Sequence, residues 1–124
     1  MALRSYTQMQ CWQDSRLLFR EMYVLFKESS ALKSEFALKD QMIRASLSIM
    51  NNIAEGFGRF SNKEFLRFLN IARGSCYEVE SMIHAMLEVE LINHTQSIVL
   101  FDLTNKIRRG LGALTKTLYN SISK

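Results

Sequence analysis

The sequence predicts an all-α protein, an antiparallel up-down four-helix bundle in which residues 1–124 form one domain. The 124-residue chain contains no proline, although average usage of about 5% would give about six. Its five glycines all lie between Gly56 and Gly112. Four apolar periodicities of three and four residues follow one another, separated by short polar or glycine-containing segments. This pattern is typical of long amphipathic helices and argues against a protein of strands and turns.

We expect the first helix at about Gln8–Glu28, where apolar residues recur along one seam from Trp12 to Phe26. Thr7 followed by Gln10 fits a capping box at its start. The segment Ser29–Phe36 then reads as a polar connector.

The second helix is expected from Leu38 or Lys39 through the stretch Gln41–Arg59, ending where Gly56 and Gly58 supply positive φ. It carries two apolar stripes, one of Leu38, Met42, Ala45, Ile49 and Ile53, the other of Ile43, Leu47, Met50 and Ala54. A monomeric four-helix bundle needs one stripe per helix. The second stripe therefore indicates either unusual burial or a subunit interface.

The third helix is expected at about Asn62–Leu91, with Ser61 and Glu64 as a capping box and a heptad seam along its length. Gly74 lies in its middle, where a glycine costs about 1 kcal/mol relative to alanine, so a close helix crossing is expected there. The fourth helix is expected at about Gln96–Ile122, with Thr95 as its cap.

The net charge of +4 lies entirely in the last part of the chain. Residues 1–93 hold 11 basic and 11 acidic residues, whereas the rest holds only Asp102 against five cations, Lys106, Arg108, Arg109, Lys116 and Lys124. Such asymmetry indicates either an acidic partner such as nucleic acid or a solubilising face. Two cysteines without a CxxC pair, an N-terminus without an apolar signal core and no long apolar run predict a cytoplasmic protein away from membranes.

One long motif resembles a known family. It consists of the run NIAEG at 52–56, then Gly58-Arg59, Ser61, Phe65, Ala72, Gly74-Ser75 and Glu78. The chain is similar in these residues, from Trp12 to the last helix, to the bacterial four-helix bundle proteins encoded in 23S rRNA intervening sequences. The resemblance implies a four-helix protomer, usually assembled as a pentameric ring, without established catalytic activity. A similar bundle occurs in accessory variability proteins of diversity-generating retroelements, which are basic pentamers that bind nucleic acid and a reverse transcriptase.

The chain departs from this pattern at three places. Met50-Asn51 stands where a proline-containing pair is common, Lys39 occupies the usual Ser/Thr cap, and Ser15 replaces an alanine. The residues that we assign to a structural motif are Trp12, Gln41, Arg44, Asn52, Glu55, Gly56, Gly58, Gly74, Ser75 and Glu78. Arg44, Asn52 and Glu55 interrupt an apolar helix, and buried polar groups need partners. A hydrogen-bond network holding the second helix is therefore preferred over an acid/base or metal role for Glu55.

Enzyme, metal and nucleotide sites are poorly supported. His84 has Glu80 and Glu88 four residues to either side, which is not the Glu-x-x-His spacing of a di-iron bundle. The glycines around Phe57 lack the preceding strand and the GK[ST] ending of a phosphate loop. We therefore expect no catalytic residue, no metal and no cofactor.

The favoured hypothesis is a non-enzymatic homo-oligomer that binds RNA or DNA with low sequence specificity or docks a nucleic-acid enzyme. The family resemblance implies that this oligomer is a homopentamer. The cations expected to contact phosphates are Arg59, Lys63, Arg67, Lys106, Arg109 and Lys116, with Asn70 and Arg73 near the first three. The alternative is a structural scaffold that docks a protein partner through an apolar groove without binding nucleic acid. A salt-dependent interaction with nucleic acid would favour the first hypothesis.

Overall fold

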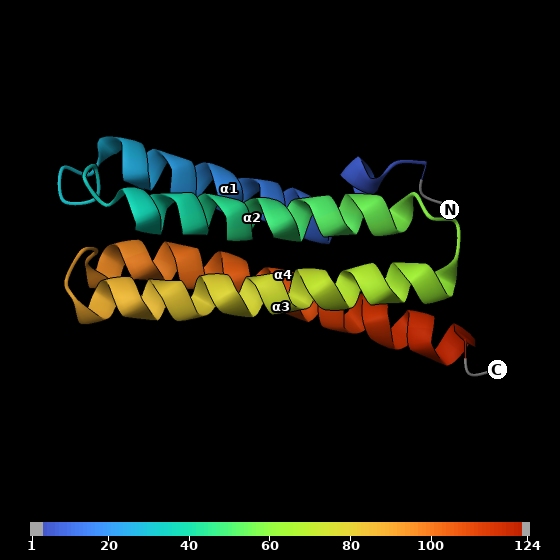
Figure 1. The fold of residues 1–124 in the computed structure, drawn as a ribbon. Helices are drawn as coiled ribbons and strands as arrows, with labels where there is room; N and C mark the ends of the chain where they lie inside the picture. Colours follow the sequence, from blue (N-terminus) through green and yellow to red (C-terminus); the bar gives the residue numbers. More distant parts are fainter. Residues whose placement is uncertain (1–3, 123–124) are drawn as a thin grey trace.

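The computed structural model describes residues 4–122, so Lys124 and the first three residues of the N-terminal segment lie outside the described residues. A short 3-10 helix, η1 (Tyr6–Gln8), precedes four helices, α1 (Gln10–Glu28), α2 (Phe36–Phe57), α3 (Asn62–Glu88) and α4 (His94–Ile122). Consecutive helices run in opposite directions and are joined by short connections (Figure 1). Each helix contacts the next along the chain, and α4 returns to contact α1. The predicted all-α bundle is therefore confirmed.

The core is formed by one stripe from each helix, as the four periodicities predict. Its fully buried members include Leu18, Met22 and Phe26 of α1, Met42, Ile49 and Ile53 of α2, Leu69, Ile83 and Met86 of α3, and Ile107 and Leu111 of α4. Burying a side chain of this size stabilises the fold by about 1.5–3 kcal/mol. The second stripe of α2, represented by Ile43, Leu47 and Met50, is only half-buried in the protomer.

The beginnings of the first two helices differ from prediction. Ser5 and Gln8, not Thr7 and Gln10, form a capping box, and it caps η1. Helix α1 then begins after Met9, which offers no side-chain cap. Helix α2 begins at Phe36 rather than at Leu38 or Lys39, also without a side-chain cap. Because good helix formers follow Phe36, the N-terminal end of α2 reaches back to this last residue of the predicted connector.

Capping at the other two helices is closer to prediction. The Ser61 side chain accepts a hydrogen bond from the Glu64 backbone N–H at 3.3 Å, which confirms half of the expected capping box. Asn93 rather than Thr95 caps α4, because its side chain and that of Gln96 accept each other's backbone N–H at 2.8 Å. Helix α4 consequently begins at His94.

Helix α3 ends at Glu88, three residues earlier than predicted. Glu90 adopts φ 59°, which is the left-handed region, and its N–H donates to the Leu87 carbonyl. The next N–H, of Leu91, donates to the Met86 carbonyl at 2.9 Å. These two bonds form the Schellman motif that commonly terminates helices.

The glycines do not act as the sequence suggested. None of them has positive φ, and Gly58 ends α2 at φ −76°. The left-handed position in this connection is occupied by Phe60, at φ 56°. Gly74 does not lie at a close crossing within the protomer, because a Cβ there would meet nothing within 4 Å. The expectation of a close approach is met instead by Gly56, which packs against α3.

Candidate nucleic-acid interface

The connection between α2 and α3 forms a corner in which two arginines lie over one aromatic ring. The guanidinium carbons of Arg59 and Arg67 are 5.0 Å and 4.5 Å from the centroid of the Phe68 ring, which is 6% exposed. Cation–π contacts of this kind contribute about 0.5–2 kcal/mol and hold the guanidinium planes in place. The corner is therefore an ordered cationic feature rather than a set of independent long side chains.

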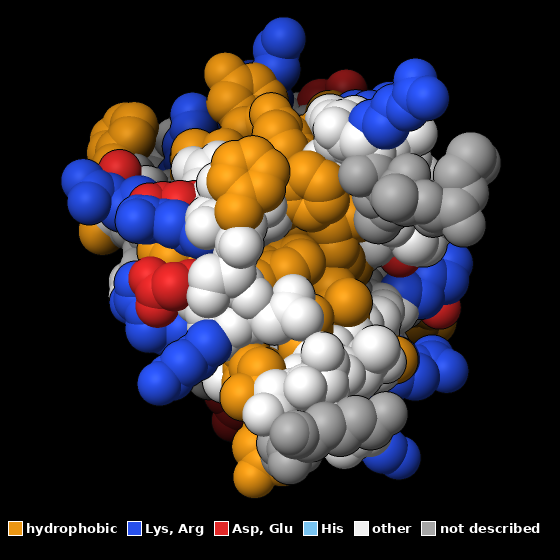
Figure 2. Space-filling view, turned by 90° about the vertical axis from the view of Figure 1, so that its right-hand side faces the viewer, with side chains coloured by type: hydrophobic (Ala, Val, Ile, Leu, Met, Phe, Trp, Pro, Cys, Tyr) orange, Lys and Arg blue, Asp and Glu red, His pale blue; other side chains and the backbone are white. Residues whose placement is uncertain are grey.

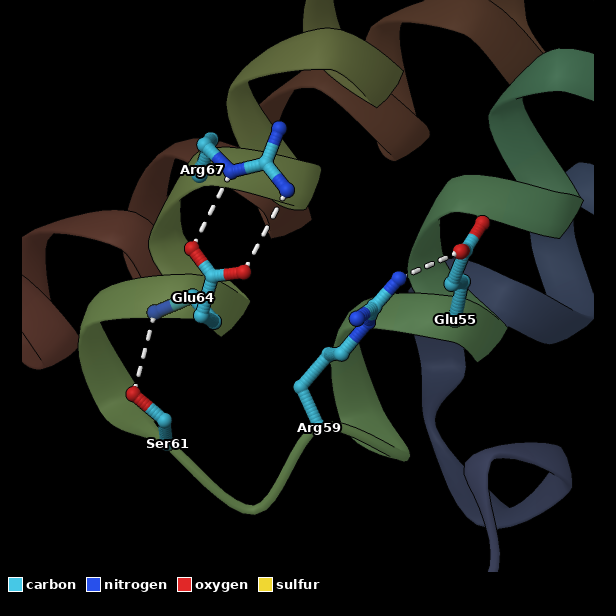
Figure 3. Close-up of polar contacts among 5 residues, drawn as sticks. All are labelled: Glu55, Arg59, Ser61, Glu64 and Arg67. Carbon is cyan, nitrogen blue, oxygen red and sulfur yellow. Dashed lines mark hydrogen bonds and ion pairs between the residues drawn. The ribbon is translucent and has the colours of Figure 1, made fainter.

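Each of these arginines also has an acidic partner (Figure 3). Arg59 Nη2 donates to Glu55 Oε1 at 2.9 Å, and Arg67 Nε donates to Glu64 Oε2 at 3.1 Å. The hydrogen bond from Arg67 lowers the pKa of the exposed Glu64 carboxyl, with a smaller contribution from its positive charge. The two carboxylates offset two of the three positive charges in the predicted stripe of Arg59, Lys63 and Arg67. Of the three cations in this stripe, Lys63 alone forms no ion pair within residues 4–122.

The three cations predicted on the last helix do not gather at this corner. Lys106 pairs with Asp102 at 3.2 Å, and together with Arg109 it lines a hollow against Gln10 and Asp14 of α1. Lys116 instead faces the groove between α3 and α4. The six predicted cations therefore occupy three separate places on the surface.

The groove between α3 and α4 contains a cationic site that the prediction captured only in part. Arg73 of α3 and Lys116 of α4 line the same hollow of about 500 Å³, together with Asn70 and Tyr119. Neither cation forms an ion pair within the described part of the chain, and the Tyr119 side chain is 62% exposed. Arg73 and Asn70 were noted in the sequence as neighbours of the basic stripe. Tyr119 was missed, because only antiparallel packing brings the end of α4 beside the start of α3.

A partly buried ion pair lies farther along the same two helices. Arg108 Nε of α4 donates to Glu80 Oε1 of α3 at 2.9 Å, and Arg108 also hydrogen-bonds Asn105 and lies 5.4 Å from the Tyr77 ring centroid. Glu80 is therefore engaged in holding α3 against α4. Sequence patterns do not signal this pair, because its members are 28 positions apart.

The polar residues of α2 are structural in only some cases. Asn52 donates to the Ser48 carbonyl at 2.7 Å and to its hydroxyl at 3.1 Å, and that hydroxyl hydrogen-bonds the Ser75 hydroxyl at 2.8 Å. This network joins α2 to α3 at mid-length. Arg44 and Glu55, by contrast, are exposed and form local ion pairs, Arg44 with Asp40 of α2 at 3.0 Å and Glu55 with Arg59 of the following connection at 2.9 Å. Within the protomer these two charges therefore lie on the solvent-facing surface and do not interrupt the buried face of α2.

The other residues of the predicted structural motif also fall into two groups, those that pack within the protomer and those that are exposed. Trp12 is half-buried and packs edge-to-face on Tyr6, with ring centroids 5.4 Å apart. Gly56 is buried against α3. Gln41, Gly58, Gly74 and Glu78 are exposed in the protomer.

Chemically reactive groups do not converge in the described residues. No three His, Cys, Asp or Glu side chains among residues 4–122 lie in an arrangement that could hold a metal ion. The His84 ring packs on Phe101 at 4.7 Å between centroids. Burial raises the pKa of the Cys11 thiol to about 11 and that of Cys76 to about 12, the opposite of what activates a nucleophile. Within the described chain, no helix is both long and apolar enough to cross a membrane.

Fold and surface together define an all-α helical-bundle protein whose notable surface features are cationic. The sequence profile of the 23S rRNA-intervening sequence protein family matches residues 7–113, and the chain belongs to that family. A comparison with curated proteins gives no match. A solved structure with a similar fold is a protein of unknown function from the S23 ribosomal protein family of Bacteroides thetaiotaomicron VPI-5482. It is 24% identical, the TM-score is 0.79, and the alignment covers 86% of this chain and 98% of that one.

Proposed function

We propose that this protein is a non-enzymatic, homo-oligomeric nucleic-acid-binding bundle that contacts phosphates through the groove between α3 and α4. The observation that carries the proposal is that Arg73 and Lys116 line the same hollow and that neither forms an ion pair in the described residues. Cations with no internal partner can neutralise phosphates and release counterions without first losing a salt bridge. The family description, which refers to an intervening sequence of 23S rRNA, is consistent with a role close to nucleic acid.

Arg59 and Arg67 extend this surface as secondary contacts. Their pairs with Glu55 and Glu64 are exposed, and exposed ion pairs contribute only about 0–1 kcal/mol. A phosphate oxygen can therefore replace either carboxylate at little cost. Lys63 lies on the first turn of α3, four residues before Arg67, and adds a third cation to this secondary surface. A surface of this kind has no base-reading helix, so low sequence specificity is expected.

Assembly is proposed to occur through the outer face of α1 and α2. Phe36 and Tyr23 are 75% and 48% exposed there, and the second α2 stripe with Ile43, Leu47 and Met50 is half-buried. Packing copies through this face would complete its burial, and family resemblance favours a closed pentamer. The cytoplasm is the compartment that suits the two unpaired buried thiols. A ring would also present the weak phosphate contacts of each protomer together, which raises avidity.

The alternative is a structural scaffold that docks a protein partner without binding nucleic acid. The observation in its favour is a mostly apolar groove between α1 and α4, where Val24 and Val99 are 38% and 48% exposed. Its rim carries Glu21 and Glu28, which would repel phosphates and suit a basic partner. This groove lies on a different side of α4 from the cationic hollow, so both functions can be tested separately.

The test is a titration of the intact oligomer with labelled 20-nucleotide RNA and DNA at two salt concentrations. Arg73→Gln/Lys116→Gln should weaken binding at low salt by at least about tenfold and reduce the salt slope by roughly 1.4–1.8, since each of the two phosphate contacts contributes about 0.7–0.9. The matched control is Arg16→Gln/Arg20→Gln, which removes the same charge from exposed positions of α1. An equal loss of affinity in both double variants would show that net charge, and not the groove between α3 and α4, determines binding. Absence of binding by the wild type at low salt would reject the proposal.

A further inference from the structure

Phe60 is the most exposed large apolar side chain among the described residues. It lies in the connection between α2 and α3, and 96% of its surface is accessible to solvent. Its backbone adopts φ 56°, in the left-handed region that side-chain-bearing residues rarely occupy. The protomer thus neither buries this ring nor gives it a relaxed backbone.

A glycine, and not a phenylalanine, is the residue expected at the left-handed position of this turn. A glycine at position 60 would adopt this φ without cost, yet the nearby Gly58 occupies an ordinary helical conformation at φ −76°. The left-handed conformation costs a non-glycine residue about 1–2 kcal/mol. Among the described residues no ring or cation–π contact engages the Phe60 side chain, so the protomer itself offers this side chain little to offset the cost.

The surroundings of Phe60 are aromatic at the floor and cationic at the rim. It borders a hollow of about 310 Å³ whose lining includes Phe57, Phe65 and Arg4. The Phe57 and Phe65 rings pack edge-to-face at 6.2 Å between centroids, which makes the floor rigid. Figure 2 looks onto the end of the bundle where this connection lies and shows hydrophobic side chains gathered in the middle with Lys and Arg around them.

The charges next to Phe60 select an anionic partner over a neutral one. Arg4, Arg59, Lys63 and Arg67 lie in the hollow or within seven residues along the connection and the first turns of α3, against Glu55 and Glu64 alone. Four cations to two carboxylates leave an excess of two positive charges. An apolar protein pocket would not need this excess, whereas a nucleotide combines a flat apolar ring with a phosphate.

We propose that Phe60 is a stacking platform for an unpaired base, so that the preferred ligand is single-stranded nucleic acid rather than an intact duplex. The inference rests on the proposed function, and it adds the class of nucleic acid and the residue that selects it. The phosphates on either side of a base stacked on this ring would be contacted by Arg59 and Lys63, which lie one residue before and three residues after Phe60. From Lys63 the strand continues along α3 to Arg73, ten residues and about 15 Å farther on at 1.5 Å per residue.

The experiment compares Phe60→Ala, Phe60→Leu and Phe60→Trp in the intact oligomer. The ligands are a 12-nucleotide poly-dT strand, an abasic strand of the same length and a duplex of the same length. Base–aromatic stacking predicts that Ala and Leu weaken poly-dT binding roughly 5- to 100-fold and leave abasic and duplex binding unchanged. Trp should retain wild-type affinity. In a Trp12→Phe background, the fluorescence of Phe60→Trp should be quenched by poly-dT and not by the abasic strand.

Three outcomes would overturn the inference. Equal affinity of the wild type for poly-dT and the abasic strand, with no loss in Phe60→Ala, would remove stacking while leaving phosphate binding through Arg73 and Lys116 intact. If Phe60→Leu retained wild-type poly-dT binding and Phe60→Ala lost oligomer mass, the Phe60 ring would be a contact between copies of the protein and not a stacking platform. No binding of any strand by the wild type at low salt would reject the proposed function and this inference together. Since the Phe60 side chain is 96% exposed in the protomer, circular dichroism should show all three variants folded.

Discussion

Gly56 lies directly against Phe68, so that a Cβ on Gly56 would be only 2.7 Å from the Phe68 Cβ and 2.9 Å from the nearest Phe65 ring carbon. Helices α2 and α3 can approach this closely only because position 56 has no side chain. The same Phe68 ring carries Arg59 and Arg67 over it. One glycine thus sets the spacing on which the cationic corner is built.

Gly56→Ala should destabilise the protein despite the better helix propensity of alanine. The added methyl group must push α3 away or force Phe65 and Phe68 from their rotamers, which costs about 1–3 kcal/mol. Urea unfolding followed by circular dichroism measures this directly. A variant as stable as the wild type would show that α2 and α3 can separate freely at this end.

Gly74→Ala is expected to have the opposite effect. A Cβ there meets nothing within 4 Å, so the substitution should raise the free energy of unfolding of the protomer by about 1 kcal/mol through helix propensity. Light scattering on the same sample supplies a second readout. A fall in oligomer mass would place Gly74 at a contact between copies, where the small residue would be needed after all.

Glu55→Gln and Glu80→Gln should differ in their effect on stability. The Glu55–Arg59 pair is half exposed and local, so its loss should cost no more than about 0.5 kcal/mol. The Glu80 side chain is 17% exposed and its removal leaves the partly buried Arg108 unpaired, which should cost about 1–3 kcal/mol. Thermal unfolding of both variants side by side compares them. A larger loss for Glu55→Gln would mean that Glu55 is buried in the oligomer.

The two thiols should be unreactive until the protein unfolds. Cys11 and Cys76 are 6% and 0% exposed, and their raised pKa values of about 11 and about 12 lower the thiolate fraction about 100-fold or more relative to an ordinary cysteine. Labelling with a chromogenic disulfide reagent at pH 8 should therefore be slower by at least that factor in the native protein than in guanidinium. Rapid labelling of either residue would contradict the burial.

The raised pKa values of the two thiols also predict that the protein becomes less stable at alkaline pH. Thiols of the unfolded chain ionise above about pH 9, while those of the folded chain stay protonated up to about pH 11 for Cys11 and about pH 12 for Cys76. The free energy of unfolding should therefore fall as the pH rises from about 9 to about 12. Below pH 9 the thiols contribute no pH dependence. Cys76→Ala should flatten the alkaline fall when compared with the wild type in urea titrations under reducing conditions.

Glu90→Gly should stabilise the end of α3. Glu90 holds a left-handed conformation at φ 59° in the Schellman motif, which glycine adopts without steric cost. Part of the gain is lost to the greater freedom of glycine in the unfolded chain, so an increase of about 0.5–1 kcal/mol is expected. Glu88→Gly, at the last helical residue of α3, is the control and should destabilise instead.

Much of this fold follows from the sequence, because helical periodicity is a local property. The spacing of Leu18, Met22 and Phe26 in α1, and the equivalent spacings in the other helices, place one apolar stripe on each helix whatever its neighbours are. Four such stripes with short connections can be buried together only in a bundle. Helix ends were less well predicted, because Glu90 and Phe60 take left-handed conformations that their residue types do not signal.

The candidate site needed the tertiary structure, because its members come from different helices. Residue types and their order already show which residues are cationic and that Arg59, Lys63 and Arg67 follow one another at intervals of four. Only the packing of α3 against α4 decided that Arg73, Lys116 and Tyr119 share one hollow while Lys106 and Arg109 face α1. Only side-chain placement decided that Glu55 and Glu64 pair with the two arginines. Charge is a property of the residue, but its availability depends on what the fold places within about 4 Å of it.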